Sequence, residues 1–282
     1  MRIILSRKGF DSASGGCPSP IFPDGRLLSL PIPDKTSPIA YRDIRFANLD
    51  VGELVAQLSD EPRRATHFAH LDPDLRPEAL PRQAGWCPLL GQTGSAQGHL
   101  RNQGVQPGDI FLFFGLFRAV ARNHQGWCFK AGEAACHLIW GWMQIAEIVK
   151  VDSLPSESLP WARYHPHFAC GRDPANTLYL AAEQLSLKDT PSGYPGAGVF
   201  QQFDERLRLT APQAALPSLW RLPNWFYPQP GRPCMSYHTD PTRWSLDGTD
   251  CRLQSAARGQ EFVLDIAATP EALPWLTAML AT

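Results

Sequence analysis

Proline is the residue that most limits what this chain can fold into. The sequence holds 27 prolines among 282 residues, about twice the average frequency. A proline ring removes a backbone donor and clashes with the preceding helical turn, so it interrupts helix interiors. Because the prolines are spread along the chain, long helical bundles and coiled coils are excluded. The sequence therefore predicts short strands joined by stiff loops, with few helices.

Composition and charge exclude further classes. Hydrophobic residues make up 44% of the chain, which is enough for a sizeable core and argues against disorder. The formal net charge is −1, so the basic excess of a non-specific nucleic-acid binder is absent. We find no signal-peptide core and no apolar run long enough to cross a bilayer. The 7 cysteines form no C-x-x-C pair, a pattern typical of reduced thiols. We expect a cytoplasmic protein with no membrane association.

Short β-rich segments alternate with irregular stretches along the chain. We expect strands over residues 2–5, 26–32, 39–46, 110–117, 137–151, 203–209 and 258–266, and helices over 50–58 and 270–280. The helix at 50–58 is the clearest, because Asp50 and Glu53 have the spacing of a capping box. Residues 67–106 have no sustained period and are predicted to be irregular. The pattern predicts a single α+β domain over 1–282, with many short strands and a few helices.

One segment resembles a known group of barrels. Pro107-Gly108-Asp109 forms a turn before a strand rich in Phe and Leu, and Gly141 lies within the later apolar run of residues 138–148. This arrangement is similar to the PUA, ASCH and EVE barrels. The resemblance covers residues 105–152 and implies a PUA-like curved sheet or barrel, in which Gly141 permits a bend. It also implies an association with RNA or with modified bases.

The loop after the first strand is dense in hydrogen-bond donors. Gly15 and Gly16 permit the left-handed backbone that lets successive amides converge on an anion. The loop matches neither a Walker A motif nor G-x-G-x-x-G, and a solvated turn is the alternative interpretation. We predict that this loop contacts a phosphate or a ribose through Ser6, Arg7, Lys8, Ser14, Gly15 and Gly16.

A polar cluster runs from His67 to Asp74. Because histidine titrates near neutrality, we predict that His70 and Asp72, together with Asp11 of the N-terminal loop, act in proton transfer. The spacing of His67 and His70 would suit a metal on a helix, but the prolines that follow argue against a helix, so we predict no metal site. A turn with Asx hydrogen bonds is the structural alternative.

Two other segments complete the predicted substrate site. His165 and His167 flank Pro166, which favours an extended backbone with both rings on one side. The start of the last strand offers groups that can clamp a phosphate or read a base edge. These groups are Arg258, Gln260 and Glu261. One or two of the aromatic residues are expected to stack on a base.

Motifs along most of the chain resemble the nucleotide-modification-associated domain family, the third type of that name. They lie at residues 6–11, 15–21, 29–33, 70–74, 113–115, 165–167, 236–238 and 258–263. The family is placed by its gene neighbourhoods near base-modification systems of phages and bacteria. The resemblance implies a role in base modification, without a mechanism, and adds His238 to the candidate substrate-binding residues.

Two functions follow as hypotheses. The first is an enzyme or accessory factor that acts on a nucleobase or nucleotide, which predicts that Asp11, His70, Asp72 and Arg258 converge in a deep pocket. The alternative is a non-enzymatic reader of modified bases in DNA or RNA, which predicts an aromatic pocket beside a basic surface. A structural subunit working with other modification enzymes is a third possibility. The sequence leaves the reaction type and any cofactor open.

Overall fold

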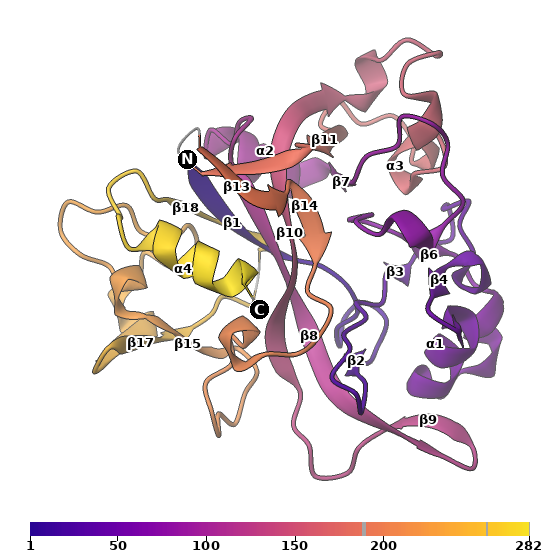
Figure 1. Cartoon of the computed structure of the whole chain (residues 1–282), viewed down its shortest axis with the longest axis horizontal. Helices are drawn as coiled ribbons and strands as arrows, with labels where there is room; N and C mark the ends of the chain where they lie inside the picture. The colour runs from indigo at the N-terminus through magenta and orange to yellow at the C-terminus, as the bar shows by residue number, and fades with distance from the viewer. Residues whose placement is uncertain (188–189, 258, 282) are drawn as a thin grey trace.

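A nine-stranded mixed sheet organises the chain in the computed structural model, which describes residues 1–187, 190–257 and 259–281 (Figure 1). The main path of the sheet runs through β18 (Glu261–Asp265), β1 (Arg2–Arg7), β8 (Ile110–Asn123), β10 (Cys136–Lys150), β11 (Thr177–Ala181) and β7 (Leu89–Gln92). Off this path, β2 (Ser19–Ile21) and β9 (Gly126–Phe129) pair with β8, and β14 (Ala197–Val199) pairs with β10. β1 is parallel to β8 and antiparallel to β18. Both faces of β1 are buried, which explains its continuous apolar sequence.

Smaller elements cover the two sides of this sheet. α4 (Ala272–Leu280) lies on one side with the sheet of β15 (Leu219–Pro223), β17 (Asp250–Gln254) and β16 (Trp244–Asp247). α1 (Val51–Ser59) lies on the other with the pairs β3 (Ile32–Pro33)–β6 (Ala69–His70) and β4 (Arg45–Phe46)–β5 (Leu49–Asp50) (Figure 1). The remaining elements are α2 (Gly94–Asn102), α3 (Pro166–Ala169) and the pair β12 (Gln184–Leu187)–β13 (Thr190–Pro195).

The large sheet does not close into a barrel within the described ranges. Its edge strands β18 and β7 have no backbone pairing with each other, and residues 105–152 contribute β8, β9 and β10 to it instead of forming a barrel of their own. The predicted barrel is therefore not found, although the α+β class is confirmed. The two edges nevertheless approach each other, since Gln92 Nε2 donates a hydrogen bond to Glu261 Oε1 over 2.6 Å.

Several elements match the sequence-based expectations. α1 begins after Asp50, whose side chain accepts a hydrogen bond from the Glu53 amide at 2.9 Å. The strands predicted at 110–117 and 137–151 correspond to β8 and β10. The register between β8 and β10 shifts between Ile139 and Gly141, and a Cβ at Gly141 would lie 2.9 Å from the Gly198 carbonyl oxygen. Gly141 thus permits the close approach of β14 next to this irregularity.

Other expectations were wrong. Residues 26–32 are mostly irregular, 39–46 contain a 3₁₀ turn before the short β4, and 203–209 contain a 3₁₀ turn in place of a strand. The region 67–106, predicted to be irregular, contains β7 and α2. The sequence of α2, Gly-Ser-Ala-Gln-Gly-His-Leu-Arg-Asn, has two glycines and only two buried side chains, so periodicity did not reveal it.

Among the described residues, no helix is long and apolar enough to span a membrane. The 7 cysteines are all free thiols, as their spacing predicted.

Candidate functional site

A pocket of about 170 Å³ lies where β1, β6 and β7 end and α3 begins. Eight residues that the sequence singled out line it: Arg7, Lys8, Asp11, Ser14, His70, Asp72, His167 and Gln260. Its remaining lining residues are Gly9, Ile32, Gly91, Gln92, Thr93 and Cys170. Segments from residues 7 to 260 therefore meet at one cavity, which is how a folded chain assembles a site from distant loops.

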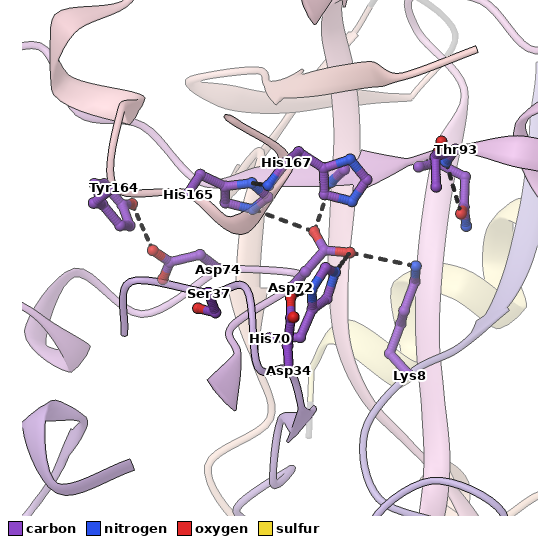
Figure 2. Close-up of polar contacts among 12 residues, drawn as sticks. Lys8, Asp34, Ser37, His70, Asp72, Asp74, Thr93, Tyr164, His165 and His167 are labelled. Atoms are coloured by element: carbon purple, nitrogen blue, oxygen red, sulfur yellow. Dashed lines mark hydrogen bonds and ion pairs between the residues drawn. The ribbon is translucent and has the colours of Figure 1, made fainter. Parts of the chain in front are cut away.

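Asp72 is the centre of this site. It follows β6 directly, and its side chain is only 2% exposed. Oδ1 accepts a hydrogen bond from the Gly91 amide at 2.6 Å, and Oδ2 lies 3.6 Å from Lys8 Nζ. Figure 2 shows the carboxylate between the Lys8 ammonium and the imidazoles of His70 and His165. Burial alone would raise the pKa of Asp72, but the Lys8 charge and the neighbouring histidines hold that pKa well below its usual range.

The His70 ring is oriented by a second carboxylate. Its Nδ1 lies 2.8 Å from Asp34 Oδ2, and its Nε2 lies 3.9 Å from Asp72 Oδ2. Asp34 is itself held by the amide and hydroxyl of Thr36. The Asp34 carboxylate can only accept at neutral pH, so Nδ1 donates to it and Nε2 is the nitrogen that faces Asp72 and the pocket.

His167 is fixed in the same way by an amide. Asn176 Nδ2 donates to the His167 carbonyl oxygen at 2.8 Å, which leaves Asn176 Oδ1 to accept from His167 Nδ1 at 2.7 Å. The proton therefore sits on Nδ1, and the Nε2 lone pair is free. Burial lowers the pKa of His167 to about 4, so this ring is neutral at physiological pH. The ring lies against the backbone of Gly91, where a Cβ would come within 2.1 Å of its Cδ2 atom.

His165 supports the carboxylate from behind. It is fully buried, and its Nε2 lies 3.4 Å from Asp72 Oδ1, outside hydrogen-bond geometry. The residue caps α3, in which Pro166 and His167 are helical, so the predicted extended His-Pro-His segment is wrong. The two rings still lie close together, with centroids 5.5 Å apart. His165 itself has the extended backbone that the following proline imposes.

Lys8 bridges two buried carboxylates. Its Nζ lies 3.6 Å from Asp72 Oδ2 and 3.7 Å from Glu261 Oε1. Burial raises the pKa of Glu261, against the opposing charge of Lys8, whereas the pKa of Asp72 is lowered. The Lys8 ammonium thus lies between two carboxyl groups whose pKa values are shifted in opposite directions, an arrangement found at catalytic sites.

Several amides of the N-terminal loop form hydrogen bonds within the loop itself. Gly15 and Gly16 adopt the predicted positive φ, at 94° and 81°. The Asp11 carboxylate accepts from the amides of Ala13 at 2.8 Å and Ser14 at 2.6 Å, and the Gly16 amide donates to the Asp11 carbonyl oxygen. The loop's own carboxylate therefore takes the place of the external anion that we expected. Asp11 and Ser14 line the pocket, and Gly15 and Gly16 do not.

Other predicted residues have structural contacts at the pocket wall or lie away from the pocket. Ser6 is fully buried beneath it, and Arg7 donates to the carbonyl oxygens of Ala256 and Ala257. His238 lies away from the pocket: its Nδ1 is 2.8 Å from the Ser236 carbonyl oxygen, and its Nε2 accepts from the Ala256 amide at 3.0 Å. Arg258 lies outside the described residues.

Three residues that orient the site were missed by sequence reasoning. They are Asp34, Asn176 and Gly91. Asp34 and Asn176 belong to polar loops whose composition resembles that of any turn, and only their contacts with an imidazole distinguish them. Gly91 lies inside β7, where a glycine signals close approach of another group. That signal was present in the sequence.

The site has the side chains that could hold a cation. His70, Asp72 and His167 each offer one ligand atom, and these atoms lie within 4.8 Å of one another. Asp72 and His167 are buried, and His70 is partly exposed. His67, the partner that sequence spacing suggested for His70, is exposed and lies outside this group.

The chain was compared with models of protein families, with curated proteins and with solved structures. The model of a family described as nucleotide modification associated domain 3 matches residues 2–265. No curated protein and no solved structure matches the chain.

Proposed function

The chain belongs to the family of nucleotide modification associated domain 3, and from this membership and the pocket we propose that it is an enzyme that binds a nucleobase or nucleotide and modifies it. One observation carries the proposal: an ionised buried carboxylate, two imidazoles with free Nε2 atoms and an ammonium converge on one cavity. These are the groups that proton transfer and charge stabilisation require.

The cavity size favours a small reacting group. Its volume of about 170 Å³ is below the range of roughly 300–1,000 Å³ that holds a drug-sized ligand. In our proposal one base or sugar ring enters, and the rest of the nucleotide or nucleic acid stays outside. Gln260, Ser14 and Thr93 line the cavity and offer hydrogen bonds to a polar ring edge.

His70 is the group that we assign to proton transfer. Its Nδ1–H is held by Asp34 and its Nε2 is directed to the pocket, which is the orientation that a histidine base needs. Asp72 stays ionised because its pKa is lowered, so its role is to stabilise positive charge that develops beside it. Lys8 balances that carboxylate and is placed to meet an anionic group.

The pocket lining favours an enzyme over a reader. A reader needs aromatic faces on which an extruded base stacks. Among the described residues that line this cavity, the only aromatic rings are the imidazoles of His70 and His167. Four tryptophans that could otherwise stack on a base are 9% exposed or less and belong to the hydrophobic core: Trp140, Trp142, Trp225 and Trp244.

The test is mass spectrometry of nucleosides from cells that express the full chain. DNA, RNA and the free nucleotide pool are digested and compared between wild type, Asp72→Asn and His67→Gln, an exposed histidine of the same segment. We expect a changed nucleoside in cells with wild type and with His67→Gln, and none with Asp72→Asn. An unchanged nucleoside profile in all three pools with wild type would remove the enzyme proposal.

A further inference from the structure

We propose that His70, Asp72 and His167 bind one divalent transition-metal ion, through the Nε2 atoms of both imidazoles and a carboxylate oxygen of Asp72. The three residues come from the end of β6 and from α3, and their ligand atoms lie within 4.8 Å of one another. The proposal concerns the metal alone, and it holds whether or not the pocket takes a nucleotide. With the ion bound, the Nε2 lone pair of His70 is a ligand, so the assignment of His70 to proton transfer applies only to the metal-free protein.

The hydrogen bonds around both rings already select the form that binds a metal. A metal-bound histidine must offer a lone pair, and it usually donates its other N–H to a carboxylate or carbonyl group. Asp34 takes this position at His70 Nδ1, at 2.8 Å, and Asn176 takes it at His167 Nδ1, at 2.7 Å. Two different loops thus supply an acceptor to the Nδ1 atoms of both rings, as the outer partners of metal-bound histidines do.

The position of each ligand is fixed before any ion enters. The Gly91 amide holds Asp72 Oδ1 at 2.6 Å, and the absent side chain of Gly91 makes room for the His167 ring. His70 Nε2 and Asp72 Oδ2 are 3.9 Å apart. Two ligands bound at 2.0–2.2 Å to one tetrahedral ion are about 3.4 Å apart. A shift of a few tenths of an ångström therefore brings this pair into coordination distance.

The charge of the cluster leaves room for a cation. Four carboxylates and two cations line or adjoin the pocket: Asp11, Asp34, Asp72 and Glu261, and Arg7 and Lys8, of which Lys8 contacts Asp72 and Glu261. With neutral imidazoles the group carries a charge of −2 when Glu261 is ionised and −1 when it is protonated. A divalent ion compensates this excess, and Lys8 still has Glu261 as its partner.

The donor set indicates the class of metal. Imidazole nitrogens suit zinc, iron, cobalt and nickel, whereas magnesium and calcium prefer sites made of oxygen ligands. Three protein ligands leave at least one position open to the pocket, which is the pattern of catalytic metal sites and not of closed structural ones. His165 lies behind Asp72, so its Nε2 supports the carboxylate and does not complete the metal's shell.

Metal binding by the full chain tests this proposal without any nucleotide. Protein stripped with a chelator is titrated with Co²⁺ and with Zn²⁺, followed by calorimetry and by the visible absorption of Co²⁺. We expect one ion per chain in wild type. We expect affinity to fall by at least about 100-fold in Asp72→Asn and His167→Gln. His67→Gln, in which the exposed neighbour is changed, should bind like wild type.

Thermal unfolding separates loss of the site from loss of the fold. Zn²⁺ should raise the melting temperature of wild type and of His67→Gln and leave the two ligand variants unchanged. If a buried variant does not fold, His70→Gln gives the same test at a partly exposed position. The proposal is overturned if wild type binds no ion stoichiometrically, if Asp72→Asn binds as tightly as wild type, or if His67→Gln loses affinity equally.

Discussion

Two pairs of histidines in this molecule differ in whether the ring nitrogen that can accept a hydrogen bond already has a donor. In the pocket, His70 and His167 each have an acceptor at Nδ1 and a free Nε2 directed toward Asp72 or the cavity. Near β18, His238 has partners at both nitrogens, and His137 accepts from Trp220 Nε1 at 2.9 Å within a group of aromatic rings. In the first pair the Nε2 atom of each ring is still free to bind a ligand, whereas the second pair contributes to the packing and hydrogen bonding of the core.

This contrast shows what distinguishes a site from a buried polar residue. Burial lowers the pKa of His167, His137 and His238 alike, so a shifted pKa does not separate the two regions. The separating feature is an unused lone pair beside a carboxylate and a cavity.

His70→Gln should have the largest effect, on activity and on metal affinity but not on the fold. Removal of the imidazole that we assign to proton transfer should lower the modification rate by about 10²–10⁴-fold. The side chain is 24% exposed, so we expect the free energy of unfolding to change by less than about 1 kcal/mol. Nucleoside mass spectrometry and denaturant unfolding measure the two quantities. Wild-type activity in this variant would place proton transfer elsewhere.

His238→Ala should show the reverse pattern. The substitution leaves the Ala256 amide without its acceptor and opens space beside Phe262, whose ring centroid is 4.6 Å from that of His238. We expect a loss of about 2–3 kcal/mol of unfolding free energy, with Co²⁺ affinity unchanged. A loss of metal binding in a variant that is still folded would show that the two regions are not separate.

Asn176→Ala tests the outer partner of His167. The ring would lose the acceptor that fixes its proton on Nδ1 and its orientation against Gly91. We expect metal affinity to fall by about 10–100-fold, the usual effect of removing such a partner. The matched control is Asn123→Ala, at the end of β8 and away from the pocket, which should leave affinity unchanged.

Part of the pH dependence of stability should come from His137 and His238, the buried histidines outside the pocket. The folded-state pKa is lowered to about 3 for His137 and about 4 for His238, mainly by burial. A neutral buried histidine contributes stability that is fully present above the unfolded pKa of about 6.5 and is lost as the pH falls toward the folded value. We expect the unfolding free energy to decrease from pH 7 to pH 5, and to decrease less in His238→Ala. An equal decrease in both proteins would contradict this assignment.

The sequence predicted the components of the site better than their arrangement. Lys8, His70, Asp72 and His167 were all selected from polar clusters in proline-rich loops, and they line one pocket. The residue types alone were enough to select these four candidates, because charged and imidazole side chains near glycine and proline are scarce in a hydrophobic core. The pairing of His70 with His167 rests on contacts between loops almost 100 positions apart, which local spacing does not encode.

The same limit explains the errors in the fold. α1 was predicted because its capping residues are adjacent in sequence, and β8 and β10 because their apolar runs are long. α2 was missed because its two glycines interrupt the apolar periodicity of a helix. His238 was wrongly assigned to the substrate site because both its hydrogen-bond partners, the Ser236 carbonyl and the Ala256 amide, are backbone groups. Backbone partners leave no trace in the residue types of a sequence.

The position of the proton on each histidine ring distinguishes the pocket histidines from those of the core. Two-bond ¹H–¹⁵N correlation spectra of histidine-labelled full chain at pH 8 report which ring nitrogen carries the proton. We predict protonation on Nδ1 in His70 and His167 and on Nε2 in His137, whose Nδ1 accepts from Trp220. Added Zn²⁺ should shift the Nε2 signals of His70 and His167 and leave His137 and His238 unchanged. A proton on Nε2 of His70 or His167, or an equal response of all four rings to Zn²⁺, would contradict the account.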